Sequence, residues 1–323
     1  MWWKKAGIAI GLISLIYLIG YKVKIDQNIL GVLSPLADEQ KTRVVFNEQN
    51  KTKYPPNDNF PLQLLPKFND TANINAKSLC VMDVDSRELL MGKNISTTMP
   101  IASVAKIMTA MVALERSSLN FEIKIPDSAC QVGEAEMGLT PGEKLTTQDL
   151  LYGMMLPSGN DAAESLAQGL GRGGREEFIN AMNEKAKELN LYDTHFVNPT
   201  GLDGNSIKET SYSTCLDLLS LTNYALKNPK FAEIVDTRYR EISYVEGKHK
   251  AFYLLNKLHL DKSYPGIKGV KPGDTPFAGE TLVSYAENGG KKLIVVLLDT
   301  LYSKDEVIKL YDDIYGKLGI KVR

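Results

Sequence analysis

The chain has 323 residues, of which 43% are hydrophobic and 24% are charged, and its formal net charge is -1. This length and composition suit one or two ordinary globular domains and exclude a disordered or collagen-like chain. The near-neutral charge provides no basic surface of the kind that nucleic acid requires, so we expect no nucleic-acid partner. The 3 cysteines and 3 histidines share no disulfide or metal-ligand spacing. We therefore expect buried, unpaired cysteines and no metal site.

An apolar segment lies at the extreme N-terminus. Residues 6–21 carry no charge and are mostly apolar, and Lys4 and Lys5 precede them. Such a run at the end of a chain is typical of an export signal or a membrane helix. No small-residue cleavage site follows closely, which favours an uncleaved, single-pass anchor over residues 1–24, with the rest of the chain outside the cytoplasm. Cleavage before Asp38, giving a secreted protein, is the alternative.

The remaining chain divides into a linker and one domain. Residues 25–75 are polar and rich in proline, as in an extended linker. Residues 76–90 predict a β-hairpin around an Asp-Ser turn. Apolar residues at helical spacing predict helices over 101–115, 147–155, 161–170, 176–189 and 304–318, and apolar runs predict strands over 281–286 and 292–299. Strands at both ends with helices between them indicate an α+β domain over residues 76–323, with one sheet built from distant segments.

Ser103 and Lys106 form the first candidate for catalysis. Residues three apart share a helix face, so the hydroxyl and the amine can meet. A serine hydroxyl is a poor nucleophile until a neighbouring base removes its proton, and a lysine can be that base when burial or another cation lowers its pKa. The helix N-terminus adds a partial positive charge where an oxyanion forms. By itself this spacing is also common on solvated helices.

Two further motifs follow in the chain. Ser158 and Asn160 lie in a break between two expected helices, where a hydroxyl and an amide can relay a proton and hold a substrate amide; a plain turn capped by Asn160 is the alternative. Lys271 precedes Pro272 and Gly273, and on a strand edge a lysine supplies charge while a glycine permits close approach of a substrate; a basic surface turn is the alternative. The order SxxK, SxN, KxG is the set found in β-lactamases and penicillin-binding proteins.

With these motifs, the chain resembles the serine-type D-alanyl-D-alanine carboxypeptidases, the low-molecular-mass penicillin-binding proteins. The resemblance extends from about residue 76 to residue 315. It also includes the stretches AKSLCVMDVDSRELLMGKN, GLTPGEKLTTQDLLYGMMLPSGNDAAESLA and HFVNPTGLDG. It implies a β-lactamase/transpeptidase-like fold, with an antiparallel sheet flanked by helices and the site at their junction. It implies no cofactor, a peptidoglycan pentapeptide as substrate, and β-lactam antibiotics as covalent inhibitors.

The resemblance also implies residue roles. Ser103 is the acylated nucleophile, Lys106 its general base, and Ser158 the group that passes a proton to the leaving amine. Asn160 binds the substrate backbone, and Lys271 lies beside the substrate carboxylate or supports Ser158. The oxyanion hole consists of the backbone N–H groups of Ser103 and of Asp274, next to Gly273.

Three departures from the family pattern concern the carboxylate of the substrate. The third motif is usually Lys-Thr-Gly, but here Pro272 offers neither a hydroxyl nor a backbone N–H. Proline is tolerated on an edge strand, so we expect the fold to survive. Asp274 adds a carboxylate that repels the one on the substrate. Ser303 or Lys304 stands where the family often has an arginine, and a lysine lacks the bidentate fork.

These departures leave alternatives to a carboxypeptidase open. A D,D-endopeptidase of the same family acts on cross-linked peptides and needs no free carboxylate near the reactive bond. A catalytically impaired wall-binding or scaffold protein is a second alternative. A class A β-lactamase is disfavoured, because Ala186 stands where the deacylating glutamate belongs.

Overall fold

The computed structural model describes residues 58–69, 73–258 and 263–322. The expected membrane segment, residues 1–24, lies outside these ranges. Residues 25–57 of the expected linker also lie outside them. Within the described ranges, no helix combines the length and the apolar character that a bilayer-spanning segment needs.

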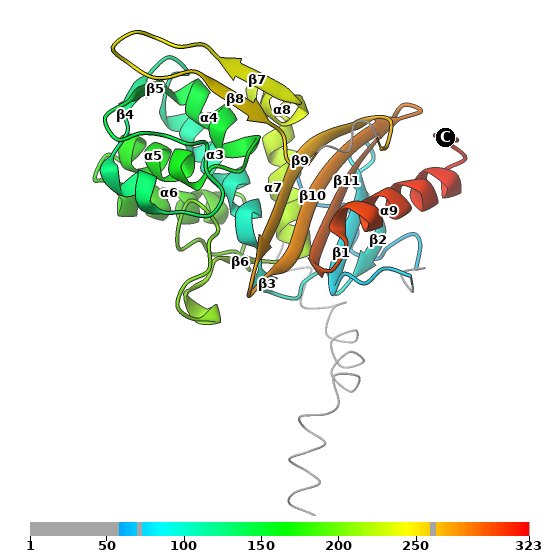
Figure 1. Cartoon of the computed structure of the whole chain (residues 1–323). Helices are drawn as coiled ribbons and strands as arrows, with labels where there is room; N and C mark the ends of the chain where they lie inside the picture. Colours follow the sequence, from blue (N-terminus) through cyan, green and yellow to red (C-terminus); the bar gives the residue numbers. More distant parts are fainter. Residues whose placement is uncertain (1–57, 70–72, 259–262, 323) are drawn as a thin grey trace, which may run out of the picture. The chain divides into compact units, whose positions relative to one another are not determined.

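A five-stranded antiparallel sheet is the centre of the fold (Figure 1). Its strand order is β2-β1-β11-β10-β9, so β9 and β2 are its edges. The strands come from both ends of the domain, as predicted, and the expected hairpin is β1–β2. The strands of this sheet are β1 Ser78–Asp83, β2 Glu88–Lys93, β9 Ile267–Thr275, β10 Gly279–Asn288 and β11 Lys291–Thr300.

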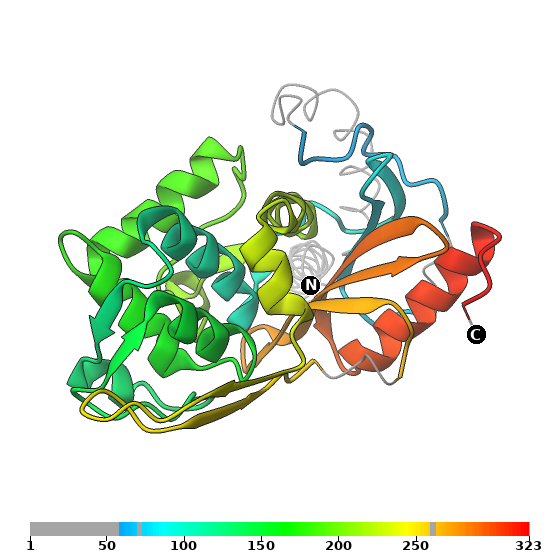
Figure 2. The same cartoon turned by 90° about the horizontal axis from the view of Figure 1, so that it is seen from above.

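Helices cover both faces of this sheet and form a separate group beside β9 (Figures 1 and 2). The helix α9 lies across one face, α7 across the other, and α3 to α6 make up the group. The α-helices are α3 Lys106–Arg116, α4 Thr147–Met155, α5 Asn160–Leu170, α6 Arg175–Glu188, α7 Cys215–Leu226, α8 Pro229–Asp236 and α9 Ser303–Lys317. The 3-10 turns are η1 Ala102–Ala105, η2 Asp127–Gln131 and η3 Ile207–Glu209.

Three short two-stranded sheets complete the described fold. They pair β3 Met99–Pro100 with β6 Tyr212–Ser213, β4 Glu122–Lys124 with β5 Lys144–Thr146, and β7 Tyr239–Ile242 with β8 Phe252–Leu255. Neither the β7–β8 hairpin nor the helices α7 and α8 were among the elements predicted from the sequence.

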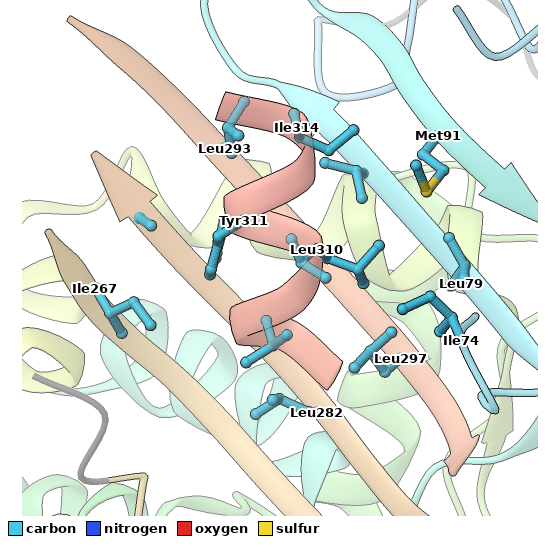
Figure 3. Packing of buried hydrophobic residues seen from close by; sticks show 14 of the residues in the cluster. Ile74, Leu79, Met91, Ile267, Leu282, Leu293, Leu297, Leu310, Tyr311 and Ile314 are labelled. Carbon is cyan, nitrogen blue, oxygen red and sulfur yellow. The ribbon is translucent and has the colours of Figure 1, made fainter. Parts of the chain in front are cut away.

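The main hydrophobic core lies between the sheet and α9 (Figure 3). Leu310, Tyr311 and Ile314 of α9 belong to the same buried cluster as Leu293 and Leu297 of β11. The intervening residues of β11 are buried as well, because α7 covers the opposite face, where the Cys215 thiol lies 3.5 Å from the Val296 carbonyl oxygen. Burial on both faces explains why this strand is a continuous apolar run rather than an alternating one.

Part of the expected linker packs on the domain. Phe60 and Ile74 are buried, and Phe68 forms a β-bridge with Met91. Apolar side chains in the described part of the proline-rich stretch therefore belong to the same compact unit as the domain.

The three cysteines are unpaired. Cys80 and Cys215 are buried, as expected of small hydrophobic residues, whereas Cys130 is partly exposed. The expectation that all three are buried was therefore wrong for Cys130, which lies in the surface turn η2.

Candidate active site

Ser103 lies in the turn η1, directly before α3 and beside the edge strand β9. Ala102, which precedes it, has a φ of +47°, a left-handed conformation that costs an alanine free energy. Gly201 packs against this turn, since a Cβ at position 201 would come within 1.8 Å of the Ala102 carbonyl oxygen. The loop that carries Gly201 therefore lies close to the backbone before the serine, and only glycine permits that approach.

The side chain of Lys106 is fully buried and makes three hydrogen bonds. Its Nζ donates to Ser103 Oγ at 2.9 Å, to Asn160 Oδ1 at 2.8 Å and to the Thr200 carbonyl oxygen at 2.7 Å. An ammonium group has three protons, so each has an acceptor. When the amine loses one proton, its lone pair can face Ser103 while the other two bonds hold it in place.

The surroundings of Lys106 lower its pKa, as the role of a general base requires. Burial, with a smaller contribution from the positive charge of Lys257, lowers the pKa of Lys106 from 10.5 to about 7, while the carboxylates of Glu134, Asp161 and Glu164 oppose this change. A large fraction of the side chain is therefore a free amine near neutral pH. A base with a pKa near the working pH is the most effective proton acceptor.

Ser158 lies in the break between α4 and α5 and contacts Lys271. Asn160 is the first residue of α5 and contacts Lys106. Ser158 is 5% exposed and has a φ of +68°. The Nδ2 of Asn160 donates to the Gly133 carbonyl oxygen at 3.0 Å, which leaves Oδ1 directed at Lys106. Asp161 accepts hydrogen bonds from the backbone N–H groups of residues 137–139 and so fixes the neighbouring loop to α5.

Lys271 of β9 is the second buried lysine. Its Nζ donates to Ser158 Oγ and to the Pro272 carbonyl oxygen, each at 2.9 Å. Burial lowers the pKa of Lys271 well below its ordinary value, with further contributions from the positive charges of Lys106 and Lys257. The predicted contact of Lys271 with the SxN serine is therefore present.

Gly273 lets β9 pass close to the turn that carries Ser103. A Cβ at this position would come within 2.6 Å of Thr281 Oγ1, 2.9 Å of the Ser103 backbone nitrogen and 3.0 Å of Ala102 Cβ. The Ser103 N–H, the expected first donor of an oxyanion hole, therefore lies beside this glycine, and its role as a donor stays a prediction. Asp274, the expected source of the second donor, is exposed and pairs with Glu280 across β9 and β10. Its role as a donor stays a prediction.

The residues expected to bind the substrate carboxylate have other partners. Pro272 lies on the edge strand β9 and is paired with Leu282 of β10. This agrees with the expectation that an edge strand tolerates a proline, which has no backbone N–H. Ser303 donates to Glu280 Oε2 through both its backbone N–H and its hydroxyl. Lys304 Nζ donates to the Lys257 carbonyl oxygen at 2.8 Å. Among the described residues, neither Ser303 nor Lys304 presents its side chain as an unoccupied carboxylate ligand.

The structure thus brings together Ser103, Lys106, Ser158, Asn160 and Lys271 in two hydrogen-bonded groups. Sequence reasoning missed Thr200, whose carbonyl oxygen helps to hold Lys106, and it missed Lys257, whose charge acts on both lysines. A backbone carbonyl leaves no residue-type signal. The stretch HFVNPTGLDG was singled out as family-like, but nothing in it indicated a contact with Lys106.

The described residues contain no cluster of histidine, cysteine, aspartate or glutamate side chains that could hold a metal ion.

Comparisons with known proteins show the family of this chain. The family model for D-alanyl-D-alanine carboxypeptidase, a family of serine peptidases, matches residues 66–301. The D-alanyl-D-alanine carboxypeptidase DacF of Bacillus subtilis is 33% identical over 245 residues, which are 73% of this chain and 61% of that protein. A D-alanyl-D-alanine endopeptidase of Pseudomonas aeruginosa is 30% identical over 253 residues, which are 76% of this chain and 75% of that protein.

A solved structure extends the likeness to three dimensions. The crystal structure of the Streptomyces K15 DD-transpeptidase matches with a TM-score of 0.71 and 30% sequence identity, over 76% of this chain and 98% of that one. The shared features are a mixed fold with an antiparallel sheet and flanking helices. With the family model matching well over half of its length, this chain belongs to the D-alanyl-D-alanine carboxypeptidase family of serine peptidases.

Proposed function

We propose that the chain removes the terminal D-alanine from peptidoglycan stem peptides, through an acyl-enzyme formed on Ser103. The observation that carries the proposal is the 2.9 Å contact between Ser103 Oγ and a buried Lys106 whose pKa lies at about 7. A hydroxyl hydrogen-bonded to a neutral amine is an activated nucleophile.

The geometry supports the following order of steps. The free amine of Lys106 takes the proton of Ser103 as Oγ attacks the carbonyl carbon of the penultimate residue, and the carbonyl oxygen accepts from the Ser103 N–H beside Gly273. Ser158, held by Lys271, passes a proton to the leaving amine as the peptide C–N bond breaks, and the proton that Lys106 took from Ser103 restores the Ser158 hydroxyl, so that Lys106 is again a free amine. Water then attacks the ester while Lys106 takes a proton from it, and Lys106 returns this proton to Oγ as the ester C–O bond breaks.

Release of D-alanine from a short peptide ending in D-Ala-D-Ala tests this proposal. We expect D-alanine from the wild-type chain and none from Ser103→Ala. Penicillin labelling without release of D-alanine would instead favour the D,D-endopeptidase alternative, which the loss of the hydroxyl at Pro272 and the added carboxylate of Asp274 support. Absence of both reactions would favour the impaired scaffold protein.

The pH dependence of acylation follows from Lys106. Since only the neutral amine accepts the proton of Ser103, we expect the acylation rate to rise with pH, with a midpoint near 7, and then to level off. The measurement is the rate of fluorescent penicillin labelling between about pH 5 and 9. Lys257→Gln removes a positive charge that lowers the pKa of Lys106, so its midpoint should move to higher pH. A rate that is constant through neutral pH would contradict Lys106 as the base.

We also propose that residues 1–24 anchor the protein in the cell membrane, with the catalytic domain outside the cytoplasm. The uncharged run at residues 6–21 and its basic N-terminal flank support this placement. After cell fractionation, we expect the full-length chain in the membrane fraction and expect external protease to degrade its domain. A soluble protein that begins near Asp38 would show that the segment is a cleaved signal instead.

A further inference from the structure

The β7–β8 hairpin has an unusual outer face. Tyr239 pairs with Leu255 and Glu241 pairs with Tyr253, and these four side chains alternate with the buried residues of the two strands. Tyr239 is 50% exposed, Tyr253 67% and Leu255 50%. The solvent-facing side of a two-stranded sheet is ordinarily polar, whereas three of these four residues are large and apolar. We call these four residues the tyrosine face.

The tyrosine face offers rings, hydroxyls and a carboxylate to a ligand. Within the described residues, neither the hydroxyls of Tyr239 and Tyr253 nor the carboxylate of Glu241 have a hydrogen-bond or ion-pair partner. Tyr244, in the loop after β7, is 65% exposed and lies near this face in sequence. Figure 1 shows the hairpin at the surface of the helical group, leading into β9. Such a combination suits a ring-shaped, hydroxylated ligand, because apolar C–H faces stack on aromatic rings while the carboxylate accepts from hydroxyls.

This face continues to the catalytic site. The pairing of the hairpin extends through Asn256, whose N–H donates to the Arg238 carbonyl oxygen, so Lys257 falls on the same side as Leu255. The N–H of Lys257 donates to the carbonyl oxygen of Leu156, two residues before Ser158. In the proposed reaction, Ser158 protonates the leaving amine. The tyrosine face therefore adjoins the side of the site from which the leaving group departs.

We propose that the tyrosine face binds the glycan of the peptidoglycan strand that forms the leaving-group side of a cross-linked substrate. The proposal rests on the acyl-enzyme of the proposed function and concerns its D,D-endopeptidase alternative, in which the leaving group is a second, glycan-linked stem peptide rather than free D-alanine. Distances along the chain agree with it. Tyr253 lies four residues from Lys257, about 13 Å along a strand. A stem peptide of three or four residues between the reactive bond and the sugar spans about 10–14 Å when extended.

Two other occupants fit the face less well. With roughly 150–250 Å² for each large side chain, the half-exposed residues present on the order of 400 Å², about half of what each partner buries in a standard interface. This face alone is therefore too small for a stable interface with a second copy of the chain. A lipid surface is disfavoured because Glu241 lies opposite Tyr253, and an ionised carboxylate is costly to move into lipid.

The experiment compares two substrates for the full-length chain. Tyr239→Ala combined with Tyr253→Ala should lower kcat/KM on insoluble cross-linked peptidoglycan by at least about tenfold, mostly through KM. The same variant should keep its rate on a soluble, sugar-free peptide ending in D-Ala-D-Ala and its rate of penicillin labelling. Tyr253→Phe keeps the ring and should retain most activity on peptidoglycan. Tyr192→Ala, which removes a tyrosine that is also 50% exposed, is the matched control and should change neither rate.

Binding separates this proposal from the proposed function. We expect the Ser103→Ala protein to sediment with glycan strands that have been stripped of their peptides. The Ser103→Ala protein that also carries Tyr239→Ala and Tyr253→Ala should not sediment with them. This result can stand even if the wild-type chain releases no D-alanine. Equal loss of activity on both substrates would mean that the tyrosines only support the fold. Unchanged binding, tyrosine-dependent self-association without glycan, or tyrosine-dependent flotation with lipid vesicles would each overturn the proposal.

Discussion

The Ser103→Ala variant should take up no fluorescent penicillin, whereas the wild-type chain takes up one equivalent. The reason is chemical, since the acyl-enzyme is an ester of this hydroxyl and no other group can replace it. Ser103 is only partly buried and accepts a single hydrogen bond from Lys106, so its loss leaves the core unchanged. The control is an unchanged thermal transition and circular dichroism spectrum. Stoichiometric labelling of the alanine variant would reject Ser103 as the nucleophile.

Loss of the base should be almost as severe. Without Lys106 no group within hydrogen-bond reach of Ser103 Oγ among the described residues accepts its proton, and we expect a loss on the order of 10³-fold or more in the acylation rate. Lys106→Met keeps much of the volume of the buried side chain, although it leaves Asn160 Oδ1 and the Thr200 carbonyl oxygen without their donor. The matched control is Lys309→Met, which removes an exposed lysine of α9 that has no assigned role in the site. Near-normal labelling of Lys106→Met would contradict the assignment.

Local patterns gave the helices and strands around the site with good accuracy. The helix α4, Thr147–Met155, has both of its expected bounds, because the Thr146 side chain accepts from the Asp149 N–H and closes the N-terminus. The main difference is at Ser103. A regular helix was expected from residue 101, but the first turn is a 3-10 turn entered through a left-handed Ala102. This turn packs against Gly201, which is distant in sequence, and helical periodicity carries no information on such a contact.

The motif residues were predicted as a set because side-chain types carry the signal, whereas their supports are mostly backbone groups. The carbonyl oxygens of Thr200 and Gly133 fix Lys106 and Asn160, and any residue type supplies a carbonyl. The pKa of Lys106 likewise depends on complete burial and on Lys257, which a window of sequence around the SxxK motif does not contain. The β7–β8 hairpin was missed because its two strands are only four residues long. A tyrosine-rich outer face also hides the alternation of polar and apolar residues that identifies a strand.

Restoring the family hydroxyl with Pro272→Thr should increase turnover of a peptide ending in D-Ala-D-Ala. A threonine hydroxyl there can donate one hydrogen bond to the charged carboxylate of the substrate, worth roughly 1.5–3 kcal/mol where water is excluded. That corresponds to a gain of about 10- to 150-fold in kcat/KM. The strand should tolerate the change, because β9 is an edge strand and a threonine suits an extended backbone. Ser303 binds Glu280 and Lys304 binds the Lys257 carbonyl oxygen, so neither side chain is directed at the substrate carboxylate. The gain should therefore be larger than in a site where an arginine already binds this carboxylate.

The control for this prediction is a change at Asp274, whose carboxylate is expected to repel the carboxylate of the substrate. Asp274 is exposed beside Glu280, and if its repulsion dominates, Pro272→Thr alone gains little and the double variant with Asp274→Asn recovers the rest. Neither change should affect a cross-linked substrate whose reactive bond is not followed by a free carboxylate, so the ratio of the two rates is the measurement. If both variants leave cleavage of D-Ala-D-Ala unchanged, the proline is neutral in this site. A wild-type chain that already cleaves that peptide as fast as its threonine-bearing relatives would contradict weakened recognition of the carboxylate altogether.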